Sequence, residues 1–224
     1  MCFSATVSFI TGGALVGTSA LVYSRIKIPR SSRCLASIPL IFGLHQCSEG
    51  LVWLGVDQQI SQQLADAAKY LYSFIAMSFW PFFIPLSILL YQYPKHHIPL
   101  KLVLAIGTVL GLYFLWSFTI ASPMQIRVNC GHSIAYLFKP PYFFSYLDKI
   151  YVFSVIIPFV LAQNPRIRYL LGPAFLGSFI LAKHLETMDN YPSIWCYLAA
   201  LISVIIFYVL YTPETKIPVA RVQQ

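Results

Sequence analysis

Charged side chains are scarce in this sequence. Lys, Arg, Asp and Glu make up 10% of its 224 residues, whereas a typical soluble domain has about 25%. Hydrophobic residues make up 58%, and the mean hydropathy is +0.70. Because a chain with so few polar side chains cannot cover its own surface in water, an ordinary soluble domain is excluded. The composition predicts a protein that is surrounded mostly by lipid.

The sequence also lacks a strong internal repeat, a low-complexity segment and any long polar stretch. Without a repeat, an inverted-repeat transporter is not supported. The length leaves no room for a second globular domain beside a membrane domain. The net charge is +8, but the basic residues fall in short clusters between apolar runs. They form no patch that could follow a phosphate backbone, so nucleic acid is not expected as a partner.

Seven apolar runs are long enough to cross a bilayer, which takes roughly 20 residues of helix. Backbone groups in lipid must be paired within the chain, so each run is expected to be helical. The sequence therefore predicts an all-α fold, a single polytopic transmembrane helix bundle over residues 1–224. The expected spans are about 6–23, 34–56, 67–91, 101–121, 143–163, 168–185 and 193–211.

Basic residues between the runs indicate the orientation of the chain, because cytoplasmic connections are enriched in Lys and Arg. One side carries Arg25, Lys27, Arg30, Arg33, Lys95, Lys101, Arg166, Arg168, Lys216 and Arg221. The other side carries only Lys69, Arg127, Lys139, Lys149 and Lys183. We therefore expect the N-terminus outside and the C-terminus in the cytoplasm, in a cell membrane such as the bacterial inner membrane.

A polar stripe interrupts the second run. Glu49 lies beyond the midpoint of this run, toward the outer side, and His45 lies one helical turn before it. Gln46 and Ser48 are beside them, and Trp53 is one turn further out. An ionisable residue inside a span is costly, so it is a functional hypothesis by default. The stripe could hydrogen-bond to neighbouring helices, bind a metal, or relay protons or bind a cationic ligand.

Other polar residues are expected on the same side as this stripe. Lys183 and His184 end the sixth run, and His132 lies in the long connection 122–142. Three histidines on one side make a zinc or other divalent metal site geometrically feasible, with His45, His132, His184 and Glu49 as ligands. The spacing matches no specific metal motif. Lys183 could instead pair with Glu49, or extend along the apolar surface with its amine in water.

Five cysteines are present, and all but Cys34 are expected toward the outer side. A disulfide would then be formed by Cys2–Cys130 or by Cys130–Cys196. The alternative is that all five are small buried thiols. Sequence does not fix the connectivity.

Three motifs resemble those of an uncharacterised family of small bacterial membrane proteins, a domain of unknown function. They are Met1-Cys2-Phe3-Ser4-Ala5-Thr6 with Ser8-Phe9, Gln46 with Glu49-Gly50 and Trp53, and Ser193-Ile194-Trp195-Cys196 with Ala199-Ala200. The resemblance extends over the whole chain and implies a shared fold, but the family has no established activity to transfer. It also implies that one site near the outer face combines Cys2, Glu49, Trp53, Trp195 and Cys196.

The leading hypothesis is an outward-facing polar pocket between the second, sixth and seventh runs, which binds or transports a small solute or ion. Glu49 would be the charged group and His45 its proton or metal partner, and the remaining ligand-binding candidates are Gln46, Trp53, Lys183, Trp195 and Cys196. A second hypothesis is a membrane-embedded metal-dependent hydrolase, with Glu49 or Asp189 as ligand or base. A third is a structural or accessory subunit whose stripe packs against a partner or a second copy.

Overall fold

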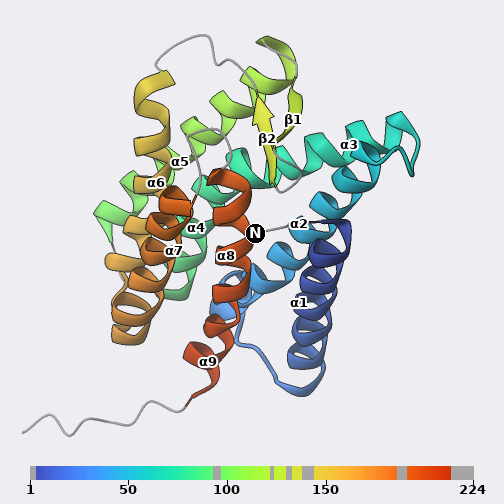
Figure 1. Cartoon of the computed structure of the whole chain (residues 1–224). Coiled ribbons are helices and arrows are strands. Elements are labelled where there is room, and N and C mark those ends of the chain that lie inside the picture. The colour runs from blue at the N-terminus through green and yellow to red at the C-terminus, as the bar shows by residue number, and fades with distance from the viewer. Residues whose placement is uncertain are drawn as a thin grey trace, which may run out of the picture.

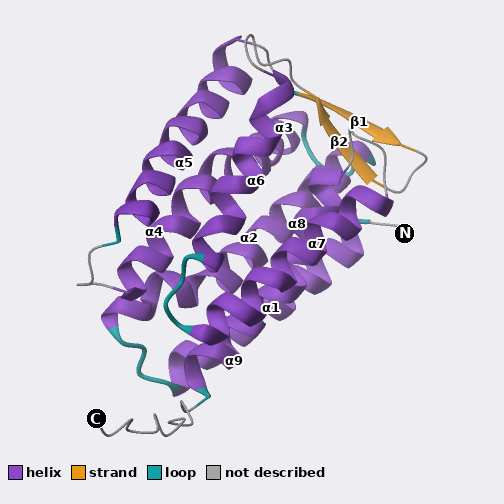
Figure 2. Ribbon diagram, turned by 90° about the vertical axis from the view of Figure 1, so that its left-hand side faces the viewer, coloured by secondary structure: helices purple, strands orange, loops and turns teal. Residues whose placement is uncertain are grey.

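The computed structural model describes residues 4–92, 97–121, 124–129, 133–137, 144–185 and 191–212. These residues form a bundle of helices with one antiparallel β-hairpin at one end (Figures 1 and 2). In chain order the elements are α1 (Ala5–Arg25), α2 (Arg33–Val56), α3 (Gln62–Ser73), α4 (Trp80–Gln92), α5 (Ile98–Trp116), β1 (Gln125–Asn129), β2 (Ser133–Leu137), α6 (Phe144–Val160), α7 (Gly172–Leu185), α8 (Tyr191–Ser203) and α9 (Ile205–Tyr211).

Several of these elements join into longer helical stretches through π-helical turns. The segment Phe74–Phe79 connects α3 to α4, the segment Ser117–Ala121 extends α5, and the segment Ile167–Leu171 leads into α7. Each of the seven apolar runs corresponds to one helical stretch, with or without such a turn, and the prediction of a helical chain is confirmed. The hairpin is the exception, because residues 122–142 were expected to be a connection without regular structure.

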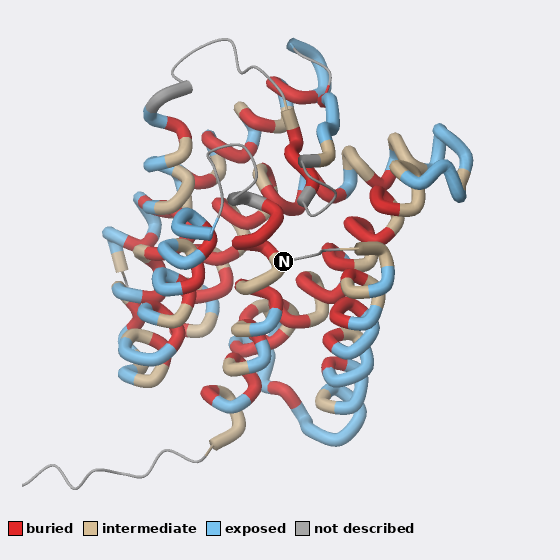
Figure 3. Tube along the Cα trace, viewed as in Figure 1, coloured by how far each residue is buried: buried red, intermediate tan, exposed pale blue. Residues whose placement is uncertain are grey.

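In the part of the chain that the structure describes, four helical stretches are long and apolar enough to cross a membrane. They are Ala5–Arg25, Gln62–Gln92, Ile98–Ala121 and Ser193–Tyr211. Large apolar side chains also point away from the bundle, and Ile10, Val109, Leu112 and Ile180 are each more than half exposed. Figure 3 shows buried residues along the middle of the molecule and exposed ones on its outer faces. An apolar outer surface of this extent is typical of a protein in lipid.

Helix α2 lies at the centre of the bundle. It contacts α1 on one side, α3 and α4 on another, and α8 and α9 on a third. It ends where Gln58 adopts a left-handed conformation with φ 57°. The amide of Gln59 then donates to the carbonyl of Leu54, and that of Gln58 to Gly55. This Schellman arrangement stops the helix, and Ser61 caps the start of α3 by accepting from the amide of Leu64.

Glycines allow two helix pairs to approach closely. A Cβ at Gly12 of α1 would lie 2.6 Å from the sulfur of Cys47 and 2.8 Å from the carbonyl oxygen of Gly43 on α2. A Cβ at Gly107 of α5 would overlap the backbone oxygen of Pro81 on α4. A side-chain tip could move aside, but a helix backbone cannot. The α4–α5 contact therefore depends on the absence of a side chain at Gly107.

We expect Gly107→Ala to lower the unfolding free energy by about 1–3 kcal/mol, the usual cost of overpacking a closed contact. The measurement is unfolding in mixed micelles titrated with a denaturing detergent. Gly13→Ala is the matched control, because nothing lies within 4 Å of a Cβ at Gly13. It should leave stability unchanged or slightly raised. Equal stabilities of the two variants would contradict the close approach of α4 and α5.

Candidate functional site

The polar stripe of α2 lies inside the bundle. His45 and Gln46 are 0% exposed, Glu49 is 1% exposed and Ser48 is 2% exposed. Ser48 is satisfied locally, because its hydroxyl donates to the carbonyl of His45. Positions three and four residues apart share a helix face, so Gln46 and His45 flank Glu49 from the turn before it. The face is directed at other helices of the bundle.

Glu49 is joined to α8 by a hydrogen bond. The hydroxyl of Ser193 donates to Oε1 of Glu49, and both residues are buried. Among the described residues, no Lys, Arg or His nitrogen lies within 4.0 Å of this carboxyl group. Asp57 is exposed, and Asp66 and Asp148 are half-buried. Glu49 is therefore the one fully buried carboxyl group in the described part of the chain, and it has no cationic partner there.

Three aromatic rings are stacked beside this carboxyl group. The ring of His45 stacks on that of Tyr72 from α3, with centroids 4.2 Å apart. The other neighbour of Tyr72 is Tyr136 from β2, at 4.3 Å. Both tyrosines are within electrostatic reach of Glu49. Since β2 also contacts α8, the hairpin covers this end of the cluster.

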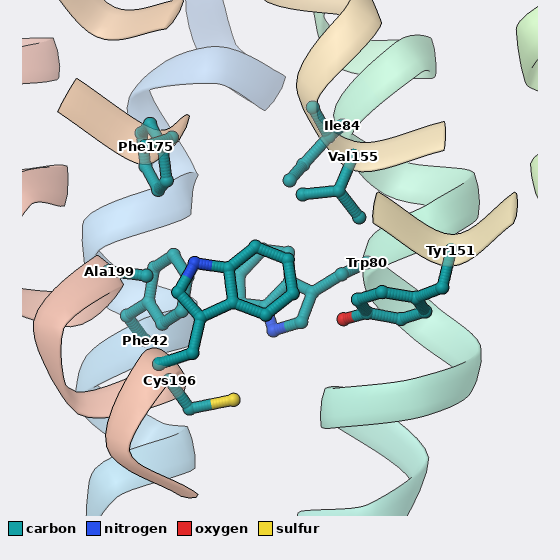
Figure 4. A pocket seen from close by; sticks show the side chains of 9 residues that line it. Phe42, Trp80, Ile84, Tyr151, Val155, Phe175, Cys196 and Ala199 are labelled. Atoms are coloured by element: carbon teal, nitrogen blue, oxygen red, sulfur yellow. The ribbon is translucent and has the colours of Figure 1, made fainter. Parts of the chain in front are cut away.

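Cys196 connects the polar cluster to a small apolar pocket. Its sulfur lies beside the hydroxyl of Tyr72, without a hydrogen bond of good geometry. It also lines a pocket of ≈20 Å³ with Phe42, Trp80, Ile84, Tyr151, Val155, Phe175, Trp195 and Ala199. Figure 4 shows the Cys196 side chain pointing from α8 toward Trp80 and Tyr151. A volume of this size holds about one water molecule.

Several buried polar atoms of the cluster have no hydrogen-bond partner within the described part of the chain. They are Nδ1 and Nε2 of His45, Nε2 and Oε1 of Gln46, Nε1 of Trp53, and the hydroxyls of Tyr72 and Tyr136. Gln46 faces the carboxyl group of Glu49, yet its amide makes no hydrogen bond to any residue that the structure describes. More than about 90% of buried polar groups in proteins are paired. A cluster of unpaired ones indicates a place for water, an ion or another small polar species.

Two predicted site residues lie elsewhere. Trp195 faces α7, where its indole nitrogen donates to Ser178 at 3.1 Å, and its ring meets Phe179 edge-on. Lys183 is exposed and pairs with Asp148 at 4.0 Å rather than with Glu49. The small pocket described above is lined in part by residues of the second, sixth and seventh runs, but it is apolar, and the polar pocket expected there stays a prediction. The buried polar cluster lies between α2, α3, α8 and β2, and Lys183 is not part of it.

The proposed metal ligands are not assembled in the described residues. No group of three His, Cys, Asp or Glu side chains there is arranged to hold a metal ion. His184 is exposed at the end of α7, whereas His45 and Glu49 are buried. His132 and Asp189 lie outside the described residues. His45 and Glu49 alone do not complete a three-ligand site.

The thiols of Cys34, Cys47 and Cys196 are free. The predicted Cys130–Cys196 disulfide is therefore not formed, which agrees with the alternative of buried thiols for Cys196. Cys2 and Cys130 lie outside the described residues. Cys2 is one of the residues of the site that the family resemblance implied.

Sequence reasoning missed three members of the cluster: Tyr72, Tyr136 and Ser193. Ser193 belongs to the last-helix motif and could have been found by asking which hydroxyl lies opposite Glu49 at the same end of the bundle. Tyr136 could have been found from the alternation of polar and apolar residues in 125–129, which is a strand signal. Nothing in the sequence distinguishes Tyr72 from the other aromatics of its run.

The fold and the cluster together define an α-helical membrane-type bundle with an ionisable side chain buried inside it. The chain belongs to DUF6629, a family of unknown function whose sequence profile matches residues 1–220. No curated protein and no solved structure matches it.

We expect Ser193→Ala to lower the unfolding free energy by about 1–3 kcal/mol, because it removes the hydrogen bond of a buried carboxyl group. Ser203→Ala is the matched control on α8, since the hydroxyl of this buried serine donates only to the carbonyl of Ala200 in its own helix. A double-mutant cycle with Glu49→Gln should give a coupling of at least about 0.5 kcal/mol. Additive effects would show that the two side chains do not interact.

Proposed function

We propose that the protein is an integral membrane protein that binds or transports a small cation, protons included, at Glu49. The observation that carries this proposal is a fully buried carboxyl group without a cationic neighbour in the described part of the chain. Taking an ionised carboxylate out of water without a partner costs several kcal/mol. The carboxyl group is therefore stable either when it is protonated or when a cation lies beside it. The proposed activity is the binding and release of this proton or cation at Glu49.

The surroundings of Glu49 favour a small species over a bulky solute. The rings of His45, Tyr72 and Tyr136 are stacked on one another, and all three residues are buried near Glu49. The adjoining pocket has room for about one water molecule. The unpaired nitrogens of His45 and the unpaired tyrosine hydroxyls could hold water molecules that solvate an ion or pass on a proton. A larger organic substrate would have to displace several buried rings.

We further propose seven spans with the N-terminus outside. The three stretches beyond the four most apolar ones, α2, α6 and α7, carry large apolar side chains on the outside of the bundle, such as Leu44, Phe153 and Ile180. These side chains would face lipid. The distribution of basic residues supports a cytoplasmic location for the α1–α2 connection and the C-terminal tail. The hairpin and the polar cluster would then lie toward the outer face of the cell membrane, the inner membrane in a bacterium.

This orientation predicts opposite labelling of two engineered cysteines in intact cells. Gln59 and Ser31 are exposed and lie in connections at opposite ends of α2. We expect Gln59→Cys to react with a membrane-impermeant maleimide added outside, and Ser31→Cys to react only after the membrane is permeabilised. Labelling is counted above that of the unmodified protein, which has five cysteines. The reverse pattern would contradict an external N-terminus.

We expect purified wild-type protein in liposomes to dissipate an imposed proton or monovalent cation gradient, read with an internal pH-sensitive or cation-sensitive dye. Glu49→Gln should reduce the flux to that of protein-free liposomes, because the neutral amide removes the charge that attracts the cation. Asp66→Asn is the matched control, since this half-buried carboxylate is already paired with Lys69 at 2.6 Å.

Retained helicity and an unchanged elution volume establish that Glu49→Gln still folds. If wild type carries no flux of H⁺, Na⁺ or K⁺ above protein-free liposomes, the transport proposal is wrong. If Glu49→Gln matches wild type, the cation does not pass through this site.

A further inference from the structure

A groove runs along the outside of the bundle between α6 and α7, which lie side by side (Figure 1). Its volume is ≈450 Å³, within the usual range of about 300–1,000 Å³ for ligand sites. Most of its lining is apolar: Val152, Phe153, Ile156, Ile157, Val160, Leu176 and Phe179. It is separate from the polar cluster around Glu49, and no residue is shared between the two.

Charged side chains are confined to one end of this groove. Lys183 lies 4.0 Å from Asp148, and each side chain is 40% exposed. Lys149 is exposed next to them, and its ammonium lies 5.6 Å from the ring centre of Tyr146. Among the described residues that line it, the charged end has two ammonium groups and one carboxylate, which together carry a net positive charge.

The length of the groove matches one leaflet of a membrane. Asp148 and Val160 are at opposite ends of its α6 wall, and the 12 residue steps between them correspond to about 18 Å at 1.5 Å per residue. One leaflet contributes about 15 Å of the hydrocarbon core. Tyr146 is exposed at the charged end, as expected for an aromatic side chain at headgroup level.

We propose that this groove binds one anionic phospholipid. An acyl chain lies along the apolar wall of α6 and α7, and the phosphate of the headgroup lies between Lys149 and Lys183. Asp148 competes with the phosphate for Lys183 and so limits the affinity. The polarity of the groove, cationic at one end and apolar along the rest, complements that of a phospholipid.

A second copy of the chain or a partner helix fits the groove less well. Transmembrane helices approach one another closely through small residues, whereas the walls here are Val, Ile, Leu and Phe. The apolar part of the groove also presents no side-chain hydrogen-bonding group that could pair with a polar residue of another helix.

The test uses delipidated full-length protein in a neutral detergent. Phosphatidylglycerol, phosphatidylcholine or inorganic phosphate is added, and bound lipid is counted by native mass spectrometry beside thermal unfolding. We expect one retained phosphatidylglycerol per chain and a rise in Tm with its concentration. Phosphatidylcholine and inorganic phosphate should have little effect. Lys149→Gln and Lys183→Gln should each weaken phosphatidylglycerol binding about fivefold, the effect of one basic residue near a membrane surface.

Three further variants make the result specific. Asp148→Asn should strengthen binding, because it removes the competing carboxylate. Leu176→Trp should abolish it by filling the groove. Lys101→Gln should leave it unchanged, since this exposed lysine is on α5, outside the groove. Equal binding of phosphatidylglycerol by wild type and the Lys149→Gln, Lys183→Gln double variant would overturn the proposal, and so would a response to inorganic phosphate alone or a dimer that protects the groove without lipid.

Discussion

The hydrogen bond between Ser193 and Glu49 is the contact on which the centre of this structure depends. It joins α2 to α8 through two residues that are 144 positions apart in the sequence, at a depth where water does not compete. A carboxyl group so placed must be neutral or must have a positive charge beside it. The residues around it are arranged for that condition: aromatic rings exclude bulk water, and unpaired polar atoms remain to accept or donate hydrogen bonds. The Glu49 side chain therefore contributes both to the contact between α2 and α8 and to the electrostatics of the cluster.

The outside of the bundle has the opposite character. Its helices present Ile, Leu, Val and Phe away from the core, and close helix contacts depend on glycine rather than on large interlocking side chains. In lipid, burial of apolar surface between helices gives little driving force, so close backbone approach and a few polar contacts must hold the bundle together. The contacts of Gly107 with α4 and of Gly12 with α2 are of the first kind, and the Ser193–Glu49 bond is of the second.

The sequence was sufficient for the helices and for the polar stripe, and insufficient for the partners of the stripe. Hydropathy reports which segments are apolar, and a helical period places His45 and Glu49 on one face. Neither reports which neighbour that face meets, because an apolar helix in lipid has no solvent-facing side to orient it. Lys183 was therefore placed in the pocket although it pairs with Asp148, and Tyr72 was overlooked among 15 tyrosines. Tyr136 belongs to a β-strand, and the helical period that predicts the other elements does not place a strand residue.

Helix α2 has a consequence for how the chain is made. It is not one of the four stretches that are apolar enough to cross a membrane by length and composition alone, although it is at the centre of the bundle. Its polar face is shielded by α3, α8 and β2, all of which are synthesised after it. During biogenesis α2 would therefore have to remain beside α1 or within the insertion machinery until the later segments are synthesised and cover Glu49. Entry of this helix into the bilayer and assembly of the site would then be one and the same event.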